Sequence, residues 1–387
     1  MRIAYCTNVR LPSERAHGHQ VAQVCDALAQ LGHDVTIYAP FRRSIVQEDY
    51  WTYYGANRSV QLLHLGYFDP IGRAFFPEII ALWMLNFFLR RNLRKALSSM
   101  DIDLVYTRSP VLLSQVLKTG LPVVLELHSL PRWLRRSFVR SCNRCRLIVC
   151  LTFSMRDELV SWGVDVARVI VEGDAVNLER FAALPSRTEA RARWGIAADV
   201  PVIGYTGQLE SMGLSKGLPE LLGAAALLLE RGESVYFLLA GGPDSARERM
   251  ENSLPAALSG RVIFTGILSR SDVPMIAAAA DVLVYPAPAS DHPFYRRDTS
   301  PLKIYEYMAT GKPVIAADLP PVRDILDAST AILVPPGDVE ALADAIESIV
   351  ADPTAAEERA VAARRRVAGH SWTERMRRIL DAATVVS

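Results

Sequence analysis

Two carboxylates, Asp298 and Glu306, stand eight positions apart in the stretch DTSPLKIYEYMATGKPVIA, with a Ser-Pro step between them. A proline suits the first position of a helix, where its missing N–H is not needed, so the spacing predicts a helix that begins at Pro301 and runs to Gly311. Asp298 would then lie just ahead of this helix, and Glu306 more than one turn inside it.

The start of such a helix is suited to binding an anion. Either Thr299 or Ser300 can cap it, and its free N–H groups together with the helix dipole form a site for a diphosphate. Glu306 can then accept hydrogen bonds from the vicinal hydroxyls of a ribose, while Asp298 reaches a sugar on the far side of the phosphates. A nucleotide sugar contains these three parts in this order.

A purely structural interpretation stays open for the same helix. Lys303, Glu306 and Thr310 recur at spacings of three and four, so they share one narrow polar face on an otherwise apolar helix. A solvated pair between Lys303 and Glu306, together with an ordinary cap, would explain that face without any ligand.

Short apolar, β-branched runs alternate with longer helical patterns along the chain, which is typical of parallel sheets covered by helices. The strand candidates are RIAYCTN, DVTIYAP, DLVYT, LPVVLEL and RLIVCLT in the front half, and PVIGYTG, VYFLLAGG, RVIFTG, DVLVYPA, KPVIAAD and AILVPP in the back half. A helix from about Gly18 to Leu31 places apolar side chains on one stripe and stops at Gly32. The expected fold class is therefore α/β.

The length of 387 residues and the hydrophobic share of 50% favour two domains. The stretch from about 170 to 195 lacks periodicity and contains glycines and a proline, which places the domains at residues 1–175 and 176–370. Two similar halves imply two Rossmann-like domains that face each other across a cleft between the carboxyl ends of their sheets.

Charge is divided unevenly between the two halves. Residues 1–170 hold 21 Lys and Arg against 13 Asp and Glu, a balance of +8, whereas residues 171–387 hold 22 against 29, a balance of −7. The front half therefore either meets something anionic, such as a membrane surface or an acidic substrate, or carries solvated charges only. The near-neutral total argues against a nucleic-acid partner.

The cysteines and the hydropathy of the chain indicate the cellular compartment in which the protein is expected. The five cysteines are odd in number and lie mostly in strand-like or helical runs, which indicates a reducing compartment. The CxxC pair of Cys142 and Cys145 lacks a second pair of ligands, so no metal site is expected. No signal peptide is visible, and the apolar run at 79–89 is shorter than the roughly 20 residues that span a bilayer. We therefore expect a cytoplasmic protein, soluble or peripheral on the inner face of the membrane.

The segment at residues 131–146 contains six arginines and no acid. Four arginines recur every four residues, with apolar side chains beside them: Arg132, Arg136, Arg140 and Arg144, with Trp133, Leu134 and Phe138. Such a basic amphipathic helix, together with residues 75–95, can rest on anionic lipid and would suit a lipid-linked acceptor. Buried helices with solvated arginines are the alternative.

The stretch from Asp298 to Ala316 resembles the Glu-x7-Glu signature of family 4 glycosyltransferases, which are retaining enzymes of the GT-B fold, with Asp298 in place of the first Glu. The resemblance covers nearly the whole chain and includes HGHQ, GHDVTIYAP, LELHS, VNLERF, YTGQLESMGLSKG, LLAGGPD, FTGIL and SWTERMRRIL. In such enzymes the last helix crosses back onto the first domain, so residues from about 371 to 387 are expected to do the same.

The resemblance implies catalytic roles for His128, Lys216 and Asp298. Lys216 would neutralise the donor diphosphate as the leaving group gains negative charge. The neighbouring family position is usually Arg but is Gln208 here, which removes one phosphate partner unless Arg296 or Arg297 compensates. His128 would lie beside the reacting sugar, although a histidine satisfied within the core remains the alternative.

The resemblance also implies the donor-binding positions, which are Gly18, Gln208, Lys216, Leu268, Ser300, Pro301, Leu302 and Glu306. Gly18 would let the loop before the first helix approach the sugar and phosphate, and backbone groups near Leu268 would hold the base. His17 and Arg108 lie at loop or strand ends and are candidates for the acceptor side.

The expected function is that of a retaining glycosyltransferase without metal or other cofactor. It would move a sugar from a nucleotide donor, most simply a UDP- or GDP-sugar, to an acceptor hydroxyl. The acceptor would be a sugar, a lipid-linked molecule or a small molecule, in polysaccharide, glycolipid or glycoconjugate synthesis.

The substitutions Gln208 and Asp298 are also compatible with a non-catalytic nucleotide-sugar-binding protein. An epimerase or phosphorylase of the same fold is a third possibility. No P-loop or GxGxxG stands between a strand and a helix, which disfavours NTPases and nicotinamide enzymes.

Overall fold

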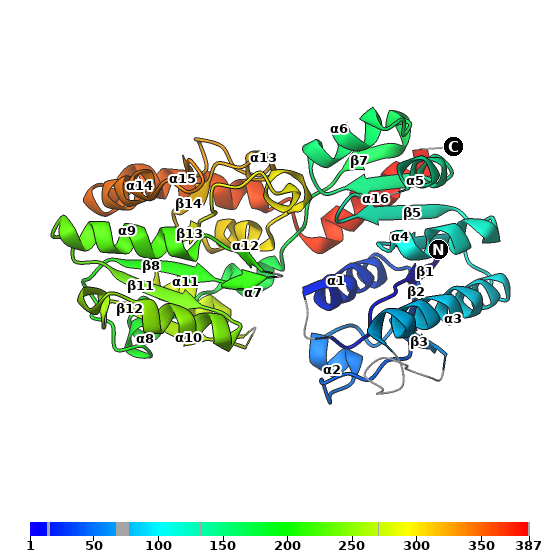
Figure 1. Ribbon diagram of the computed structural model, residues 1–387, viewed down its shortest axis with the longest axis horizontal. Helices are drawn as coiled ribbons and strands as arrows, with labels where there is room; N and C mark the ends of the chain where they lie inside the picture. The colour runs from blue at the N-terminus through cyan, green and yellow to red at the C-terminus, as the bar shows by residue number, and fades with distance from the viewer. Residues whose placement is uncertain (14–15, 67–76, 132–133, 212, 270, 386–387) are drawn as a thin grey trace. The chain divides into compact units, whose positions relative to one another are not determined.

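The computed structural model describes residues 1–13, 16–66, 77–131, 134–211, 213–269 and 271–385. The chain divides into two compact units, one formed by residues 1–173 with 372–387 and the other by residues 174–371 (Figure 1). Each unit contains a parallel sheet with helices on its faces, so the expected α/β class with two Rossmann-like parts is confirmed.

The described part of the first unit contains a seven-stranded sheet in the order β3-β2-β1-β4-β5-β6-β7, and every neighbouring pair in it is parallel. Its strands are β1 (Arg2–Cys6), β2 (Asp34–Pro40), β3 (Gln61–Leu65), β4 (Leu104–Thr107), β5 (Val123–Leu127), β6 (Leu147–Cys150) and β7 (Val169–Val171). The five strands predicted for the front half are thus all present.

The helices of the first unit are α1 (Ala16–Gln30), α2 (Tyr50–Tyr54), α3 (Glu78–Ser98), α4 (Pro110–Val116), α5 (Arg135–Cys142), α6 (Phe153–Ser161) and α16 (Trp372–Val385), with 3₁₀ turns at Leu117–Thr119 and Val166–Arg168. The predicted apolar stripe of α1 is buried at Val21, Val24, Cys25 and Leu28. The C-terminal helix α16 packs against α1 (Figure 1), and the Thr373 hydroxyl donates a hydrogen bond to Gln30 Oε1 over 2.8 Å.

The second unit contains a six-stranded parallel sheet in the order β12-β11-β8-β13-β14-β15, and a short antiparallel hairpin of β9 (Glu210–Ser211) and β10 (Leu214–Ser215). Its sheet strands are β8 (Val202–Thr206), β11 (Tyr236–Ala240), β12 (Val262–Gly266), β13 (Val282–Tyr285), β14 (Val314–Ala317) and β15 (Ile332–Val334). These correspond to the six strands predicted for the back half.

The helices of the second unit cover both faces of its sheet. They are α7 (Leu178–Ala182), α8 (Arg187–Ala192), α9 (Leu218–Glu230), α10 (Asp244–Ser253), α11 (Val273–Ala279), α12 (Leu302–Thr310), α13 (Pro320–Arg323), α14 (Val339–Ala351) and α15 (Pro353–Val367), with a 3₁₀ turn at Ala256–Leu258 and a π-helical turn at Phe294–Asp298. Along β11, Phe237 and Leu239 pack on one side with α9 and α14, whereas Leu238 packs on the other with α8 and α11. This alternation follows from the two-residue period of a strand.

Two further properties bear on the sequence predictions. All five cysteines are buried as free thiols, consistent with the absence of a disulfide framework. Within the described ranges, no helix combines the length and the apolar composition needed to cross a bilayer.

Glycine is required where the carboxyl ends of β8, β11 and β12 meet. Gly241 follows β11 with φ of +146°, and its N–H donates to the carbonyl of Gly266 over 2.8 Å. A Cβ on Gly241 would overlap the carbonyl oxygen of Gly207, which is backbone and cannot rotate away. The close approach of these three strand ends therefore depends on a residue without a side chain.

We expect Gly241→Ala to lower the free energy of unfolding by at least about 3 kcal/mol, because backbone strain and a backbone clash add together. Gly232→Ala is the matched control, since Gly232 also has positive φ (+86°) but open space around it, and it should lose only about 1 kcal/mol. Urea denaturation of both variants measures the difference. Equal losses would show that the strand ends do not need this glycine.

Candidate active site

Most residues singled out in the second unit lie near the carboxyl ends of β8 and β13, where the strand order reverses. In open parallel sheets, ligands bind at such a reversal because the connections leave in opposite directions. Gly207 and Gln208 follow β8 directly, and the π-helical turn and α12 follow β13. Lys216 lies between the hairpin and α9.

Lys216 and Asp298 are connected through the π-helical turn. The Lys216 ammonium lies 3.9 Å from the ring centre of Phe294, and the Tyr295 hydroxyl donates to the Ser215 carbonyl over 2.5 Å. Burial lowers the pKa of the half-buried Lys216 to about 8. The turn that ends at Asp298 thus also holds the lysine.

Asp298 is already engaged by an arginine. Arg297 Nε lies 2.6 Å from one carboxylate oxygen of Asp298, and a terminal nitrogen of the same guanidinium lies 3.1 Å from the other. Both side chains are largely buried. Arg296 pairs with the exposed Asp291 at 3.4 Å. Both arginines that the sequence suggested as substitutes for a phosphate-binding arginine thus have carboxylate partners in this structure.

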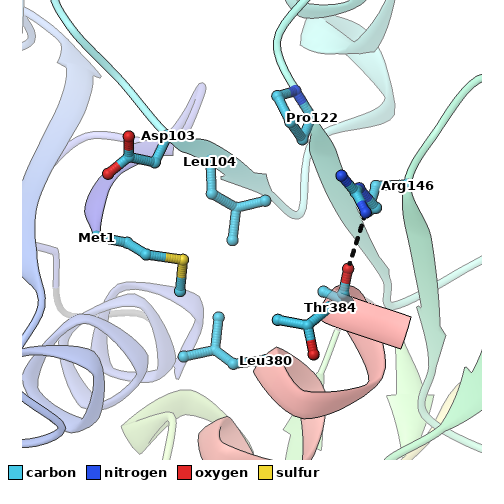
Figure 2. A pocket seen from close by; sticks show the side chains of 8 residues that line it. Met1, Asp103, Leu104, Pro122, Arg146, Leu380 and Thr384 are labelled. Atoms are coloured by element: carbon cyan, nitrogen blue, oxygen red, sulfur yellow. Dashed lines mark hydrogen bonds between the residues drawn. The ribbon is translucent and has the colours of Figure 1, made fainter. Parts of the chain in front are cut away.

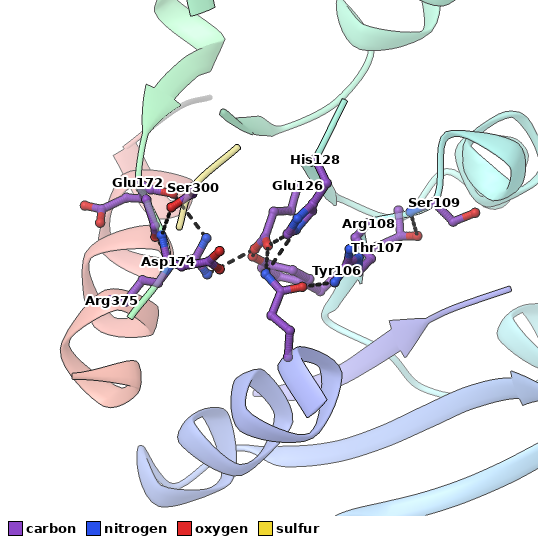
Figure 3. Close-up of polar contacts among 12 residues, drawn as sticks. Tyr106, Thr107, Arg108, Ser109, Glu126, His128, Glu172, Asp174, Ser300 and Arg375 are labelled. Carbon is purple, nitrogen blue, oxygen red and sulfur yellow. Dashed lines mark hydrogen bonds and ion pairs between the residues drawn. The ribbon is translucent and has the colours of Figure 1, made fainter. Parts of the chain in front are cut away.

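Helix α12 begins one residue later than predicted. Pro301 is its N-cap residue, with φ of −80° and ψ of 97°, and Leu302 is the first helical residue. The predicted cap is wrong, because the Ser300 hydroxyl instead accepts a hydrogen bond from the N–H of Asp174 over 2.8 Å (Figure 3), and Thr299 is buried beside Tyr285. The helix ends at Gly311 as predicted, with φ of 71°.

Two polar residues of α12, Glu306 and Lys303, contact different neighbouring elements. Glu306 is partly exposed, and one of its carboxylate oxygens lies 3.9 Å from Arg180 on α7, which packs against α12. Lys303 is directed into the unit, where its ammonium donates to the Tyr205 hydroxyl over 2.8 Å. Lys303 therefore does not form the solvated pair with Glu306 that the purely structural interpretation requires.

Two other predicted donor-binding residues lie at strand ends of the same unit. Gln208 is exposed, and its carbonyl accepts a hydrogen bond from the Tyr205 hydroxyl over 2.5 Å. Leu268 lies two residues after β12 and packs its side chain against the core near α8 and α11. If Leu268 contacts a ligand, it would therefore do so through its backbone and not its side chain.

In the first unit, His128 follows β5 and belongs to a polar network (Figure 3). His128 Nε2 lies 2.7 Å from Oε1 of Glu126, and the side-chain amide of Gln20 donates to the same oxygen over 2.7 Å. Arg108, which follows β4, donates to the Gln20 side-chain carbonyl. Arg108 thus reaches the histidine through Gln20.

The second oxygen of Glu126 accepts hydrogen bonds from the Tyr106 hydroxyl and from Arg375 on α16, the latter over 3.1 Å. Glu126 and Arg375 are 1% and 0% exposed, so their charges are paired out of water. Burial alone would raise the pKa of Glu126, but Arg375 together with hydrogen bonds from His128 and Tyr106 holds it well below its usual value.

Four members of this network were not predicted from the sequence: Gln20, Tyr106, Glu126 and Arg375. A signal existed for two of them, because Glu126 interrupts the apolar run LPVVLEL and Gln20 stands beside the apolar stripe of α1. Nothing local marked Arg375, which is one of several arginines in α16.

His128 is neutral at neutral pH. Burial and, secondarily, the charge of Arg108 lower its pKa to about 4, although Glu126 acts in the opposite direction. Because Nε2 faces a carboxylate, the network assigns the imidazole proton to that nitrogen and leaves Nδ1 as a hydrogen-bond acceptor. The histidine is partly exposed, with 22% of its side chain accessible, so it is not enclosed within the core.

Gly18 lies in the first turn of α1, not in the loop before it as predicted. A Cβ at this position would overlap the Tyr54 hydroxyl, which donates to the Ser13 carbonyl over 2.8 Å and accepts from the Ser13 N–H over 2.7 Å. Packing of Tyr54 thus accounts for this glycine. His17 is half-buried beside it on the same turn.

The basic segment at 131–146 forms a shorter helix than expected. Helix α5 covers Arg135–Cys142, while Arg132 and Trp133 lie outside the described residues. Phe138 and Cys142 are buried, and the Arg135 guanidinium lies 4.4 Å from the ring centre of Trp162. Of the predicted apolar neighbours, Leu134 is exposed and Phe138 packs inward. For this helix the structure favours the alternative of an inward apolar side with solvated arginines.

A small hollow of about 230 Å³ lies at the opposite edge of the first sheet, near the amino ends of β1, β4 and β5 (Figure 2). Met1, Asp103, Leu104 and Pro122 line it together with residues of α16. Arg146 is directed across it and donates to the Ala383 carbonyl over 3.5 Å. The hollow is thus distant from the strand ends that carry His128 and is not part of the candidate site.

Comparison with known proteins supports one family for both units. A family model described as Glycosyltransferase Family 4 matches residues 18–180, and one described as Glycosyl transferases group 1 matches residues 200–352. The chain is 28% identical to alpha-D-kanosaminyltransferase of Streptomyces kanamyceticus over 74% of its length and 76% of that protein. It is 27% identical to GDP-mannose-dependent alpha-mannosyltransferase of Mycobacterium tuberculosis over 96% of its length and 93% of that protein.

Solved structures share the fold over the full length. Sucrose-phosphate synthase from Thermosynechococcus elongatus superposes with a TM-score of 0.74 at 20% identity, covering 99% of this chain and 98% of that one. Anabaena HepE in complex with UDP and glucose superposes with a TM-score of 0.71 at 18% identity, covering 99% of both chains.

The lowered pKa of His128 predicts a pH-dependent loss of stability. Between the ordinary histidine pKa of 6.5 and the folded value of about 4, the unfolded chain binds a proton that the folded chain does not. Stability therefore falls as the pH falls through this window, by about 2 kcal/mol near pH 4.5. Urea denaturation at about pH 7 and about pH 4.5 measures it. The His128→Gln variant should lose about 2 kcal/mol less than wild type between these two pH values. An equal loss of stability in both proteins would contradict the attribution of the loss to His128.

Proposed function

This chain belongs to the glycosyltransferases of group 1 and family 4, has the GT-B fold and uses a nucleotide sugar, and from that premise we propose a retaining, metal-independent hexosyl transfer to an acceptor hydroxyl. The observation that carries the proposal is the joint placement of Lys216, Asp298 and the start of α12 near the carboxyl ends of β8 and β13. Lys216 provides a cation, Asp298 a carboxylate, and the first turn of α12 backbone N–H groups that have no partner within the helix.

The donor occupies the start of α12 in this proposal. The backbone N–H groups of Ser300 and Leu302, where the helix dipole is positive, face the diphosphate, and Pro301 between them has no N–H and fixes the start of the helix. Glu306 accepts hydrogen bonds from the ribose, and backbone groups near Leu268 hold the base. UDP or GDP is the expected nucleotide, since one full-length relative is named as GDP-mannose-dependent and a structural neighbour holds UDP.

The chemical step separates the sugar from the diphosphate. The bond between the anomeric carbon and the phosphate oxygen breaks, and its electron pair stays on the leaving nucleoside diphosphate. Lys216 and the α12 N–H groups stabilise this charge. The acceptor oxygen then bonds to the anomeric carbon from the same face, and its proton passes to a leaving phosphate oxygen, so configuration is retained.

The first unit is assigned to the reacting sugar and the acceptor. His128 presents a neutral imidazole whose Nδ1 can accept a hydrogen bond from a sugar hydroxyl. His17 and Arg108 are the candidates for contacting the acceptor.

The charge of Lys216 should be needed for turnover. We expect Lys216→Ala to reduce kcat at least about 100-fold, as the loss of one group that stabilises developing charge typically does. Lys312→Ala is the matched control, because Lys312 is also half-buried in the second unit but lies away from the site, and it should stay within about twofold of wild type. Product formation from nucleotide sugars measures both, and turnover of Lys216→Ala within a few-fold of wild type would refute the mechanism.

Donor binding can be tested without knowing the acceptor. Calorimetry against UDP, GDP, ADP and dTDP in EDTA should show that one nucleotide binds, and Glu306→Ala should weaken it at least about tenfold through the lost ribose contacts. Glu347→Ala removes another carboxylate with an arginine partner and should have no effect. Failure of all four nucleotides to bind would favour a chain that has lost its donor site.

We also propose that a lipid-linked acceptor is reached from an anionic membrane, and that α3 rather than α5 meets the lipid. One stripe of α3 is buried: Ala81, Leu85, Leu89, Leu93 and Leu97. Large apolar side chains are exposed in its first half: Ile79, Ile80, Trp83, Phe87 and Phe88. Arg91, Arg94 and Lys95 are exposed in its second half. Apolar groups followed by cations match a lipid interface with anionic head groups.

Co-sedimentation with vesicles tests this surface. Wild type should bind phosphatidylglycerol vesicles at low salt and phosphatidylcholine vesicles weakly, and the double variant Trp83→Ser with Phe87→Ser should lose at least about tenfold in binding, because two large apolar side chains no longer enter the interface. Replacing Arg136 and Arg140 of α5 by Gln should have a smaller effect. The proposal fails if wild type does not sediment with anionic vesicles, or if wild type elutes as a dimer in gel filtration and the double variant of α3 as a monomer.

A further inference from the structure

The structure contains a partly buried amine, that of Lys303, which the proposed function has not used. Lys303 lies in the first turn of α12, immediately after Leu302, where the diphosphate is expected. Burial in the first place, and the charge of Lys216 in the second, lower its pKa to about 7, while Glu306 acts in the opposite direction. Partial removal of a lysine from water beside another positive charge is unfavourable unless something compensates for it.

The surroundings of Lys303 explain how its amine is held. The ammonium donates to the Tyr205 hydroxyl over 2.8 Å and lies 4.1 Å from the centre of the same ring. Tyr285 contributes a second ring at 5.7 Å. These tyrosines come from β8 and β13, the strands on either side of the reversal in strand order, so the amine lies at the position where a ligand is expected.

The end of β8 leaves room for this amine. Gly207 has no side chain, and a Cβ there would lie only 2.7 Å from Lys303 Nζ. The next residue is Gln208, whose carbonyl accepts the proton of the Tyr205 hydroxyl. Tyr205 therefore fixes the lysine beside the position at which the resemblance expects an arginine. An ammonium has three N–H donors, so two remain after the bond to Tyr205.

The arginines that could otherwise compensate for Gln208 have other partners. Arg297 forms a two-point contact with Asp298, and Arg296 pairs with Asp291. Lys216 and Lys303 are two cations of the same unit, and the charge of Lys216 lowers the pKa of Lys303. An anion with several oxygens between them would relieve their repulsion and use the donors of both.

We propose that Lys303 is a second diphosphate-binding cation of the donor site and takes the place of the arginine that Gln208 lacks. This inference rests on the proposed function, because it assigns a residue to the same donor. Its recognition is specific for the phosphates, since neither the base nor the sugar offers comparable negative charge.

The test compares ligands with and without phosphates. We use UDP and GDP, together with uridine and guanosine. Lys303→Met removes the charge, and Lys303→Gln removes it but keeps a polar end that can bond to the Tyr205 hydroxyl. Each should raise the Kd of the nucleoside diphosphate at least about tenfold, because one charge-assisted hydrogen bond is lost. Affinity for the free nucleoside should change less than about twofold.

Two further variants make the test specific. Lys312→Met, a half-buried lysine with a lowered pKa away from the site, should leave all affinities unchanged. Gln208→Arg in the Lys303→Met background should recover a large part of the affinity for the diphosphate, because it returns a cation to the neighbouring position. Circular dichroism and thermal unfolding establish that each variant is folded.

The outcomes separate this inference from the proposed function. If wild type binds none of UDP, GDP, ADP and dTDP, the proposed function is wrong. If wild type binds one of them and both folded Lys303 variants bind it within about twofold of wild type, only the role of Lys303 is wrong. An equal loss for nucleoside and nucleoside diphosphate would also overturn it, because the lysine would then support the pocket and not the phosphates.

Discussion

Both units depend on a parallel strand at which the order of the sheet reverses. In the first unit β1 lies between β2 and β4, and in the second β8 lies between β11 and β13. Connections on the two sides of such a strand leave in opposite directions, so the carboxyl ends there remain open to side chains and ligands. Arg108, Gln208 and Asp298 follow β4, β8 and β13, at or next to these strands, whereas His128 and Leu268 follow β5 and β12, one strand further out.

In the first unit, one charged pair buried out of water organises the site. Glu126 on β5 binds His128 with one oxygen and Arg375 with the other. Removing either partner of a buried pair leaves an uncompensated charge, which is strongly destabilising, so the histidine and the C-terminal helix are held by the same carboxylate. Helix α16 is thus part of the support of the site as well as a cover for α1.

In the second unit, aromatic residues hold two lysines near the ends of β8 and β13. The π-helical turn holds Lys216 through Phe294 and the Ser215 carbonyl, and Tyr205 holds Lys303. A resemblance based on aligned motifs compares positions along the chain, and therefore registers Gln208 as the loss of a positive charge. A cation for the phosphates of the proposed donor can come from another element of the fold. In our proposal that element is α12, and the cation is Lys303. The same fold can in this way keep the chemistry of a site while its residues change.

The sequence by itself determined the α/β class, every sheet strand except β3 and β7, the apolar stripe of α1 and the end of α12 at Gly311, because these follow from local periodicity and glycine conformation. It also identified the family through the stretch around Asp298 and Glu306. Only the tertiary structure decided the partners of the polar side chains. Ser300 binds a residue 126 positions away, Lys303 one 98 positions away, and Arg375 one 249 positions away. A hydrogen-bond partner depends on which distant strand end folding brings near, and no local pattern encodes that choice.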